Sequence, residues 1–491
     1  MRGRTTAFPR RLVVSGLTAL VTGTLAVVAA GTPQATLDQA AAATQTRPNI
    51  VVIQTDDQTL ESMRVMDNVN SLIGDRGVTF RNSFVNHSLC CPSRATFLTG
   101  DYMHNHRVFG NKYPGGGFRR FQELRGNYNL AHWLQRAGYY TAMIGKYLNE
   151  YRADSPVPTG WSEWRAAPEG YGVYNYPLNV NGTLVQYGSD PWDFKQDVLT
   201  RNAVNLVNRR APPLKPFFLW LTYTAPHWSP PDPNPNPPSN CQLAAKPAPR
   251  HANAFDSEPL PRPPNFNEAN VTDKPGRIRQ RSRLTANQIA DIQRMYRCEL
   301  ESLLSVDEGV KKVVDALQAK GELSNTVLIY TSDNGYFHGE HRIPKDKQHI
   351  YEESIRVPLL MRGPGIPQGA NLGPLVINAD LAPTLVDLAN ANPGQAMDGR
   401  SLIPVANNPS IEQGRELLIE EPTFAAIRTS RYMYAEYRTG ERELYDLSND
   451  PFELVSRHNG PTYASVRQRL ATELQKLRTC GGSSCRLHST P

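Results

Sequence analysis

The chain reads Ile50-Val51-Val52-Ile53-Gln54-Thr55-Asp56-Asp57 at the start of its first strongly patterned region. A short apolar run of this kind, rich in β-branched residues, predicts a strand that is buried on both faces of a parallel sheet. Three later runs have the same form, at residues 139–144, 217–223 and 327–331. We therefore predict an α/β fold with a large, mostly parallel central sheet.

Amphipathic helices separate these predicted strands. Apolar residues follow the i, i+3, i+4, i+7 spacing of a helix at residues 130–137 and again at residues 310–317. Gly138 closes the first pattern and Gly321 closes the second, and glycine commonly terminates helices. Helices that alternate with parallel strands are expected to flank the sheet on both faces.

The chain has 491 residues, which is more than a single hydrophobic core usually serves. Short strand patterns at 425–429, 432–437 and 443–447 precede a helical pattern at 466–477. We predict a main domain over residues 46–404 and a C-terminal subdomain over residues 405–491. The subdomain is expected to be a small antiparallel sheet packed by one helix.

Residues 228–283 are rich in proline and polar residues and show no periodicity. Strand and helix patterns resume after them, which favours an insertion or ordered loop over a plain linker between domains. This segment is expected to lie against the surface of the main domain.

Six cysteines invite disulfides if the protein is exported. Cys480 and Cys485 flank a short glycine and serine segment, and we expect them to close a small loop. Cys241 and Cys298 are the candidates for a second bridge, across the proline-rich segment. The remaining two, Cys90-Cys91, are adjacent, and adjacent cysteines rarely bridge one another because the geometry is strained.

Residues 1–43 have the form of an export signal. An arginine-rich start precedes apolar and small residues at 12–30 and an alanine cluster at 40–43, where a peptidase could cut. A membrane anchor is the alternative, but serine, threonine and glycine dilute the apolar stretch. We predict an exported protein, secreted or extracytoplasmic, with no stable membrane partner. The pair Arg10-Arg11 points to the twin-arginine route.

The formal net charge of the chain is +7. Four arginines and one aspartate in residues 1–43 contribute 4 − 1 = 3 of these charges. The rest of the chain is therefore only mildly basic, which suits a small anionic substrate and does not indicate nucleic acid.

Polar residues follow the ends of four predicted strands. In chain order they are Asp56-Asp57, Lys146, His227 and Asp333-Asn334. Because the carboxyl ends of parallel strands lie along one edge of a sheet, we expect these side chains to converge. Three carboxylates and an amide oxygen form an all-oxygen set that suits Ca²⁺ or Mg²⁺ and not zinc. Any one of these aspartates alone would be interpreted as a helix cap or turn residue.

Cys90 heads the run Cys90-Cys91-Pro92-Ser93-Arg94, and residues 93–99 have the pattern of a helix start. Proline is accepted in the first turn of a helix. A group at the position of Cys90 would face unpaired backbone N–H groups and the positive end of the helix dipole, as an anion site requires. From these residues alone, a functional cysteine and a structural or disulfide-bonded thiol are equally good interpretations.

The run from Cys90 to Gly100 resembles the signature of the sulfatase family, C-x-P-S-R-x-x-x-x-T-G, in which the cysteine is oxidised to formylglycine (3-oxoalanine). Other stretches resemble the family in the same order: Asp56-Asp57, Gly145-Lys146-Tyr147, Ala225-Pro226-His227, Ser332-Asp333-Asn334-Gly335, Lys347 before Tyr351-Glu352, Arg356-Val357-Pro358 and Leu444-Tyr445-Asp446-Leu447. Cys90-Cys91 and residues 145–150 look closest to the branch of the N-acetylglucosamine-6-sulfatases and their bacterial relatives. The resemblance implies an alkaline-phosphatase-like fold, with residues 46–404 as the catalytic domain.

The resemblance also implies an activity, the hydrolysis of a sulfate monoester of a small molecule or saccharide, with a sulfated sugar favoured. It carries over the metal ligands Asp56, Asp57, Asp333, Asn334 and the modified Cys90, with Ca²⁺ as the ion and Mg²⁺ as the alternative. Arg94 and Lys146 would hold the formylglycine hydrate, while Lys146, His227 and Lys347 would bind the substrate. One hydroxyl of the hydrate attacks sulfur, His227 protonates the departing alcohol, and the second hydroxyl expels sulfate. A formylglycine-generating maturation enzyme is the implied partner.

One position departs from the family pattern. Many sulfatases have a histidine two residues after the lysine, where it assists the release of sulfate, and this chain has Leu148 there. The candidates for that role are His104, His106, His338 and His349. For each of them alone, a surface or structural histidine is the better interpretation.

Two alternatives to a sulfatase stay open. A phosphonate monoester or phosphodiester hydrolase of the same superfamily would use similar geometry, because sulfate and phosphate esters share their shape. A non-catalytic carbohydrate-binding relative is the least favoured alternative, since Cys90, Arg94 and the acidic residues are all present.

Overall fold

β1, Asn49–Asp56, lies in the middle of a ten-stranded sheet of the computed structural model, which describes residues 47–168, 170–212, 215–231, 241 and 243–488. The strand order is β10-β2-β9-β8-β1-β7-β3-β4-β5-β6. The other strands are β2 Val78–Phe84, β3 Tyr140–Lys146, β4 Glu163–Ala167, β5 Pro177–Val180, β6 Thr183–Gln186, β7 Phe217–Pro226, β8 Thr326–Ser332, β9 Leu359–Arg362 and β10 Ala370–Ile377. β1 pairs in parallel with β7 and β8, whereas β9 and β5 run antiparallel to their neighbours. The prediction of a large, mostly parallel sheet is confirmed.

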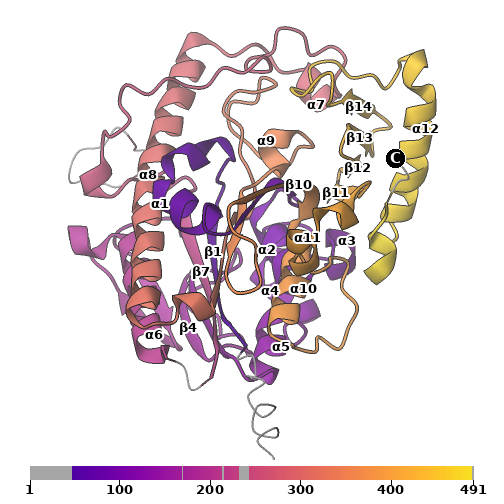
Figure 1. The fold of residues 1–491 in the computed structure, drawn as a ribbon. Coiled ribbons are helices and arrows are strands. Elements are labelled where there is room, and N and C mark those ends of the chain that lie inside the picture. The colour runs from indigo at the N-terminus through magenta and orange to yellow at the C-terminus, as the bar shows by residue number, and fades with distance from the viewer. Residues whose placement is uncertain (1–46, 169, 213–214, 232–240, 242, 489–491) are drawn as a thin grey trace, which may run out of the picture. The chain divides into compact units, whose positions relative to one another are not determined.

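Helices cover both faces of this sheet (Figure 1). The helices are α1 Asp67–Val69, α2 Cys90–Thr99, α3 Met103–His106, α4 Gly117–Arg125, α5 Leu130–Arg136, α6 Lys195–Arg210, α7 Gly276–Arg279, α8 Ala286–Ala319, α9 Glu352–Ile355, α10 Leu381–Leu388, α11 Ile403–Asn407 and α12 Ala464–Leu477. α5 matches the predicted helix, and the pattern at 310–317 lies near the C-terminal end of the much longer α8.

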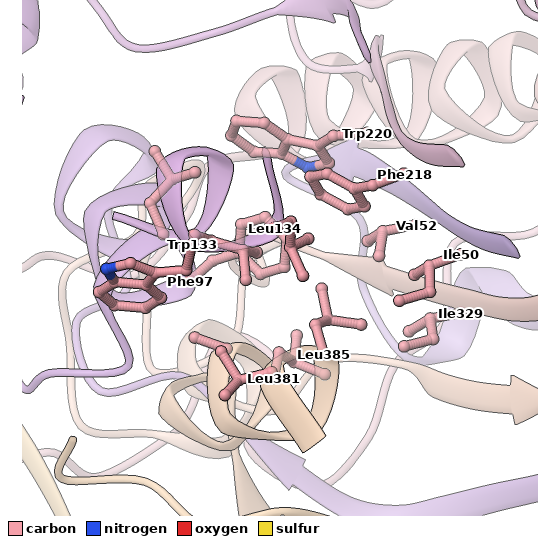
Figure 2. Close-up of a cluster of buried hydrophobic side chains, with 14 of the residues drawn as sticks. Ile50, Val52, Phe97, Trp133, Leu134, Phe218, Trp220, Ile329, Leu381 and Leu385 are labelled. Atoms are coloured by element: carbon pink, nitrogen blue, oxygen red, sulfur yellow. The ribbon is translucent and has the colours of Figure 1, made fainter. Parts of the chain in front are cut away.

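The alternation of side chains along β1 divides the core in two. Ile50 and Val52 point into one cluster of buried side chains, together with residues of α2, α5 and α10 (Figure 2). Val51 and Ile53 point into the other cluster, against α6 and α8. Because successive side chains of a strand point to opposite faces, burial on both faces requires the continuous apolar run found here.

The C-terminal part forms a four-stranded antiparallel sheet, packed by α12. Its strands are β11 Leu417–Glu421, β12 Phe424–Arg428, β13 Tyr432–Tyr437 and β14 Arg442–Asp446. Three of them and the helix were predicted from the sequence, and β11 was not. One hydrophobic cluster contains Phe84 and Ile377 of the large sheet together with Leu444 and Leu470. The two sheets therefore share a core.

Two disulfides join the cysteines that the sequence analysis paired. Cys241–Cys298 ties the proline-rich segment to α8, with 5.6 Å between the Cα atoms. Cys480–Cys485 closes the small loop after α12, with 5.0 Å between the Cα atoms. Cys90 and Cys91 are the unbridged cysteines of the described chain.

The predicted export signal, residues 1–43, lies outside the described residues. Among the helices of the described part, none is long and apolar enough to cross a membrane. The described part of the proline-rich segment contains turns, a 3-10 turn at Pro249–His251 and the single helical turn α7.

Candidate active site

Polar residues lie at the carboxyl ends of four neighbouring strands, along one edge of the large sheet. Asp56 is the last residue of β1 and Asp57 follows it, while Lys146 is the last residue of β3. His227 follows β7, and Asp333-Asn334 follows β8. These strands are adjacent in the order β8-β1-β7-β3 and run parallel, so their carboxyl ends meet. The structure thus brings together residues that are up to 278 positions apart (334 − 56).

Cys90 points into this group from the first residue of α2. The helix begins three residues earlier than the sequence pattern indicated, so Cys90-Cys91-Pro92 forms its first turn. The Cys90 thiol is buried, with its Sγ 3.4 Å from Asp56 Oδ1 and 2.9 Å from Lys347 Nζ. A group held here faces the helix N-terminus and two ionisable side chains at once.

Three cations face three carboxylates around Cys90. Lys146 pairs with Asp56, and Lys347 pairs with Asp57. Arg94 Nε donates to Asp333 Oδ2 at 2.7 Å, and both side chains are fully buried. The charges of these six side chains sum to zero. A bound divalent cation would leave the group at about +2, a charge suited to holding a sulfate ester.

Burial and neighbouring charge shift the pKa values in this group in opposite directions. Burial alone would raise the pKa of Asp56, but the positive charges around it, of which Lys146 contributes most, together outweigh burial and hold the pKa below the ordinary value. Burial, reinforced by the charge of Asp56, raises the pKa of Asp333 to about 6. Burial, followed by the charge of Asp56, also raises the pKa of the Cys90 thiol to about 12. An unmodified Cys90 in this environment is a thiol and a weak nucleophile.

The donor set fits a hard divalent cation. Asp56, Asp57 and Asp333 are buried, and the buried Asn334 Oδ1 has no hydrogen-bond partner within the described chain. Asn334 Nδ2 donates to Asp57 Oδ1 at 2.6 Å, which holds the amide beside the carboxylates. Ligand atoms of Asp56, Asp57, Cys90 and His227 lie within 4.8 Å of one another. Buried carboxylate oxygens with an unpaired amide oxygen are typical of Ca²⁺ or Mg²⁺ sites.

His227 is held by its ring nitrogen and by an aromatic stack. Its Nδ1 donates to the carbonyl of Trp228 at 2.7 Å, so Nε2 is the atom left to face Asp57 Oδ2 at 3.6 Å. Tyr171 stacks on the imidazole with 3.8 Å between ring centroids, and Lys146 Nζ lies 4.8 Å from the same tyrosine ring. Sequence reasoning missed Tyr171, because it lies between two glycines in a segment without strand or helix pattern.

The histidine candidates for the role left open by Leu148 are bonded elsewhere. His104 contacts Glu420, His106 contacts Thr96, His338 contacts Glu299, and His349 contacts Arg277. Leu148 itself is 3% exposed and belongs to the hydrophobic core. Each candidate histidine thus has a partner outside the Cys90 group, and the role stays unassigned.

Comparison of the sequence with protein-family models identifies the family of this chain. Residues 48–391 match the Sulfatase model, and residues 339–480 match N-sulphoglucosamine sulphohydrolase, C-terminal. The chain belongs to the sulfatase family. It is a sulfuric ester hydrolase with the fold that the sequence resemblance implied.

Relatives of this sulfatase cover most of its length. Human N-acetylglucosamine-6-sulfatase is 34% identical over 498 residues, with 90% of this chain and 86% of the relative covered. An arylsulfatase of Volvox carteri is also 34% identical, over 91% of this chain and 76% of the relative. One solved structure, of a protein in complex with its substrate D-glucosamine-2-N,6-O-disulfate, has a TM-score of 0.70 at 25% identity and covers 88% of this chain and 98% of its own.

A phosphonate monoester hydrolase of Agrobacterium radiobacter shares the fold. Its structure matches with a TM-score of 0.65 over 88% of this chain and 95% of its own. The two sequences are 21% identical, so the likeness concerns the fold alone.

Replacement of Arg94 by alanine should destabilise this sulfatase strongly. It leaves the carboxylate of Asp333 buried without its guanidinium, which typically costs about 3–5 kcal/mol. Arg119→Ala is the matched control, because Arg119 pairs with Glu123 on the surface with 68% of its side chain exposed. Such a pair contributes ~0.5 kcal/mol or less. Urea unfolding of both variants measures the difference, and equal losses would contradict the buried ion pair.

Proposed function

We propose that this sulfatase removes the 6-O-sulfate of glucosamine units in a sulfated saccharide, with a formylglycine made from Cys90. The observation that carries the proposal is the position of Cys90, at the start of α2 and in contact with Asp56 and Lys347. The substrate class is supported by relatives that are named N-acetylglucosamine-6-sulfatases and by the glucosamine disulfate in the solved structure.

A divalent cation is part of this proposal, with Ca²⁺ favoured over Mg²⁺. The ligands would be Asp56, Asp57, Asp333, Asn334 and residue 90. The ion would supply Lewis-acid stabilisation of negative charge on the sulfuryl group. Formylglycine, as its hydrate, would supply a nucleophilic hydroxyl and a second hydroxyl through which sulfate is released.

The basic residues around Cys90 would bind and orient the reacting groups. Lys146, at the end of β3, and Lys347, in the loop before α9, would spread the charge that grows on the sulfuryl oxygens. Arg94 is fixed by Asp333 and by the carbonyl of Lys146, and its buried Nη2 has no partner in the described chain. This N–H group is available to hold a hydroxyl at residue 90.

His227 would protonate the leaving alcohol. Its Nδ1–H bond to the Trp228 carbonyl leaves Nε2 as the nitrogen that can carry and deliver a proton. The stacked Tyr171 fixes the plane of the imidazole, so the proton would be delivered in one direction. The alkoxide that departs from sulfur would receive it, and the sugar alcohol would be released.

Export is also proposed for this chain, through the leader at residues 1–43. Some relatives are named extracellular sulfatases, which is consistent with export. Cys90 is buried in the folded protein, so a maturation enzyme must reach it before or during folding. The twin-arginine route, which carries folded proteins, would require that this conversion is complete in the cytoplasm.

Conversion of Cys90 should determine the activity. Mass spectrometry of the tryptic peptide 82–94 is expected to show an aldehyde at position 90 in active protein. Cys90→Ala should lower turnover by roughly 10³-fold or more, because the nucleophile is lost. Cys91→Ala is the matched control and should keep most of the activity, since Cys91 packs in the core. Full activity from protein with a thiol at Cys90 would refute this mechanism.

A substrate panel tests the proposed specificity. We expect the kcat/KM for N-acetylglucosamine 6-sulfate to exceed that for nitrophenyl sulfate, and nitrophenyl phosphonate and phosphodiester substrates to be the poorest of the panel. A preference of tenfold corresponds to about 1.4 kcal/mol in the transition state. The highest kcat/KM on a phosphonate ester or phosphodiester would support the alternative hydrolase, and the highest value on an aryl sulfate would refute the sugar assignment.

A further inference from the structure

A second group of ligand-type side chains lies apart from the Cys90 group. His341, Glu353 and Glu453 each offer a ligand atom, and these atoms lie within 4.8 Å of one another. Asn265 joins them, because its Nδ2 lies 3.2 Å from His341 Nε2 and 2.7 Å from Glu353 Oε1. None of these residues belongs to the group around Cys90. They come from the proline-rich segment, the loop before α9, α9 itself and the loop after β14.

Several polar atoms in this second group are buried without a partner. Asn265 and Glu453 are each 1% exposed. Asn265 Oδ1, Glu353 Oε2 and Glu453 Oε1 have no hydrogen-bond partner among the described residues. Buried polar atoms of this kind are rare in folded proteins, and an unpaired one commonly marks a missing ion or water. Three of them in one cluster indicate a ligand that binds oxygen.

Glu353 and Glu453 form no ion pair with a lysine, arginine or histidine among the described residues. The basic charge that acts on Glu453 is that of Arg428, which itself pairs with Glu352. Burial, followed by the charge of Glu340, raises the pKa of Glu353 to about 8. Burial, followed by the charges of Glu352 and Glu353, raises the pKa of Glu453 as well. The unpaired carboxylate oxygens of Glu353 and Glu453 are therefore available to bind a cation.

His341 has the orientation of a metal ligand. Its Nδ1 lies 2.7 Å from Glu268 Oε2 and donates to that carboxylate, which leaves Nε2 unprotonated. A carboxylate that orients an imidazole through its other nitrogen is the usual second shell of a metal-bound histidine. Nε2 faces the amide of Asn265, and the O and N atoms of such an amide are interchangeable by a half-turn. After that turn, Asn265 Oδ1 would face both His341 and Glu353.

We propose that Asn265, His341, Glu353 and Glu453 form a second, structural site for a divalent cation. One imidazole, two carboxylates and one amide oxygen suit a borderline ion such as Zn²⁺ or Mn²⁺ better than Ca²⁺, which prefers oxygen alone. The site is therefore distinct in chemistry from the all-oxygen group at Asp57.

A pocket of about 190 Å³ borders this site at Glu353. Glu353 lines it, together with the carboxylates of Glu61, Glu340 and Glu352. The four carboxylates outnumber the two basic side chains of the lining, Arg356 and His338, so the pocket would attract a cation towards Glu353.

The ion would link four segments that are distant in the sequence. Glu353 lies next to Ser354, whose carbonyl accepts a hydrogen bond from Gly335 N at 2.9 Å, directly after Asn334. Lys347 lies in the loop between His341 and α9. A cation at this site would therefore fix the loop that carries Lys347 and the turn that carries Asn334. The structure assigns the ion a role in stability rather than in the reaction.

Zinc and manganese binding to the full-length protein tests the site. The protein is stripped with chelator, saturated with Ca²⁺ and then titrated with Zn²⁺ or Mn²⁺, with bound metal measured by plasma mass spectrometry. We expect about one equivalent beyond Ca²⁺ and a rise in Tm on binding. Glu453→Gln and Glu353→Gln should lose that equivalent. Glu268→Gln should bind roughly 10- to 100-fold more weakly, because only the orientation of His341 is lost.

Two further variants make the result decisive. Glu61→Gln removes an exposed carboxylate from the same pocket and should bind the same equivalent as the wild type. Asn265→Asp adds a third carboxylate, so it should bind the ion more tightly. If the wild type binds no more Zn²⁺ or Mn²⁺ than Glu453→Gln, the glutamates are held by protons and the proposal is wrong. Asn265→Asp would then lower the Tm in the presence of either ion.

Discussion

The burial of three carboxylates at the ends of β1 and β8 is the constraint on which the rest of the site depends. Asp56, Asp57 and Asp333 are almost fully removed from solvent, and charges in that position must be compensated. The compensation comes from Lys146, Lys347 and Arg94, which are held by other elements. The candidate active site is therefore a balance of charges that no single segment of the chain could establish.

The parallel sheet makes this balance achievable. Its strands are buried on both faces, so their backbone is rigid, and their carboxyl ends present side chains to one edge. α2 adds a helix N-terminus to that edge, with Cys90 as its first residue. The apolar run of β1 anchors the strand in the core. It thereby fixes where the carboxylates of the two aspartates after the run lie.

Much of the central sheet and of the candidate site could be predicted from the sequence, because both depend on local residue patterns. Buried parallel strands are continuous apolar runs, so β1, β3, β7 and β8 were visible, and their order along one edge predicted the convergence of their polar ends. The strand β11 was not predicted, because its five residues end in two glutamates and so do not form a continuous apolar run. The start of α2 was misplaced by three residues because Cys90-Cys91-Pro92 carries no apolar periodicity.

Contacts that depend on loops could not be predicted. Tyr171 reaches His227 from a glycine-flanked segment, and its ring stack leaves no trace in the spacing of residues. Asn265 and Glu453 lie in segments without strand or helix pattern and are 188 positions apart (453 − 265), yet both are buried beside Glu353. Such groups are set by tertiary packing, on which a single sequence carries no local signal.

The calcium content of the purified protein tests the central claim most directly. If the buried carboxylates form a cation site, plasma mass spectrometry should find about one Ca²⁺ or Mg²⁺ per chain in the wild type. Asp57→Asn should retain much less of this ion, and chelation of the wild type should abolish hydrolysis reversibly. A fully active wild type that contains neither Ca²⁺ nor Mg²⁺, and that is indifferent to chelator, would contradict the account.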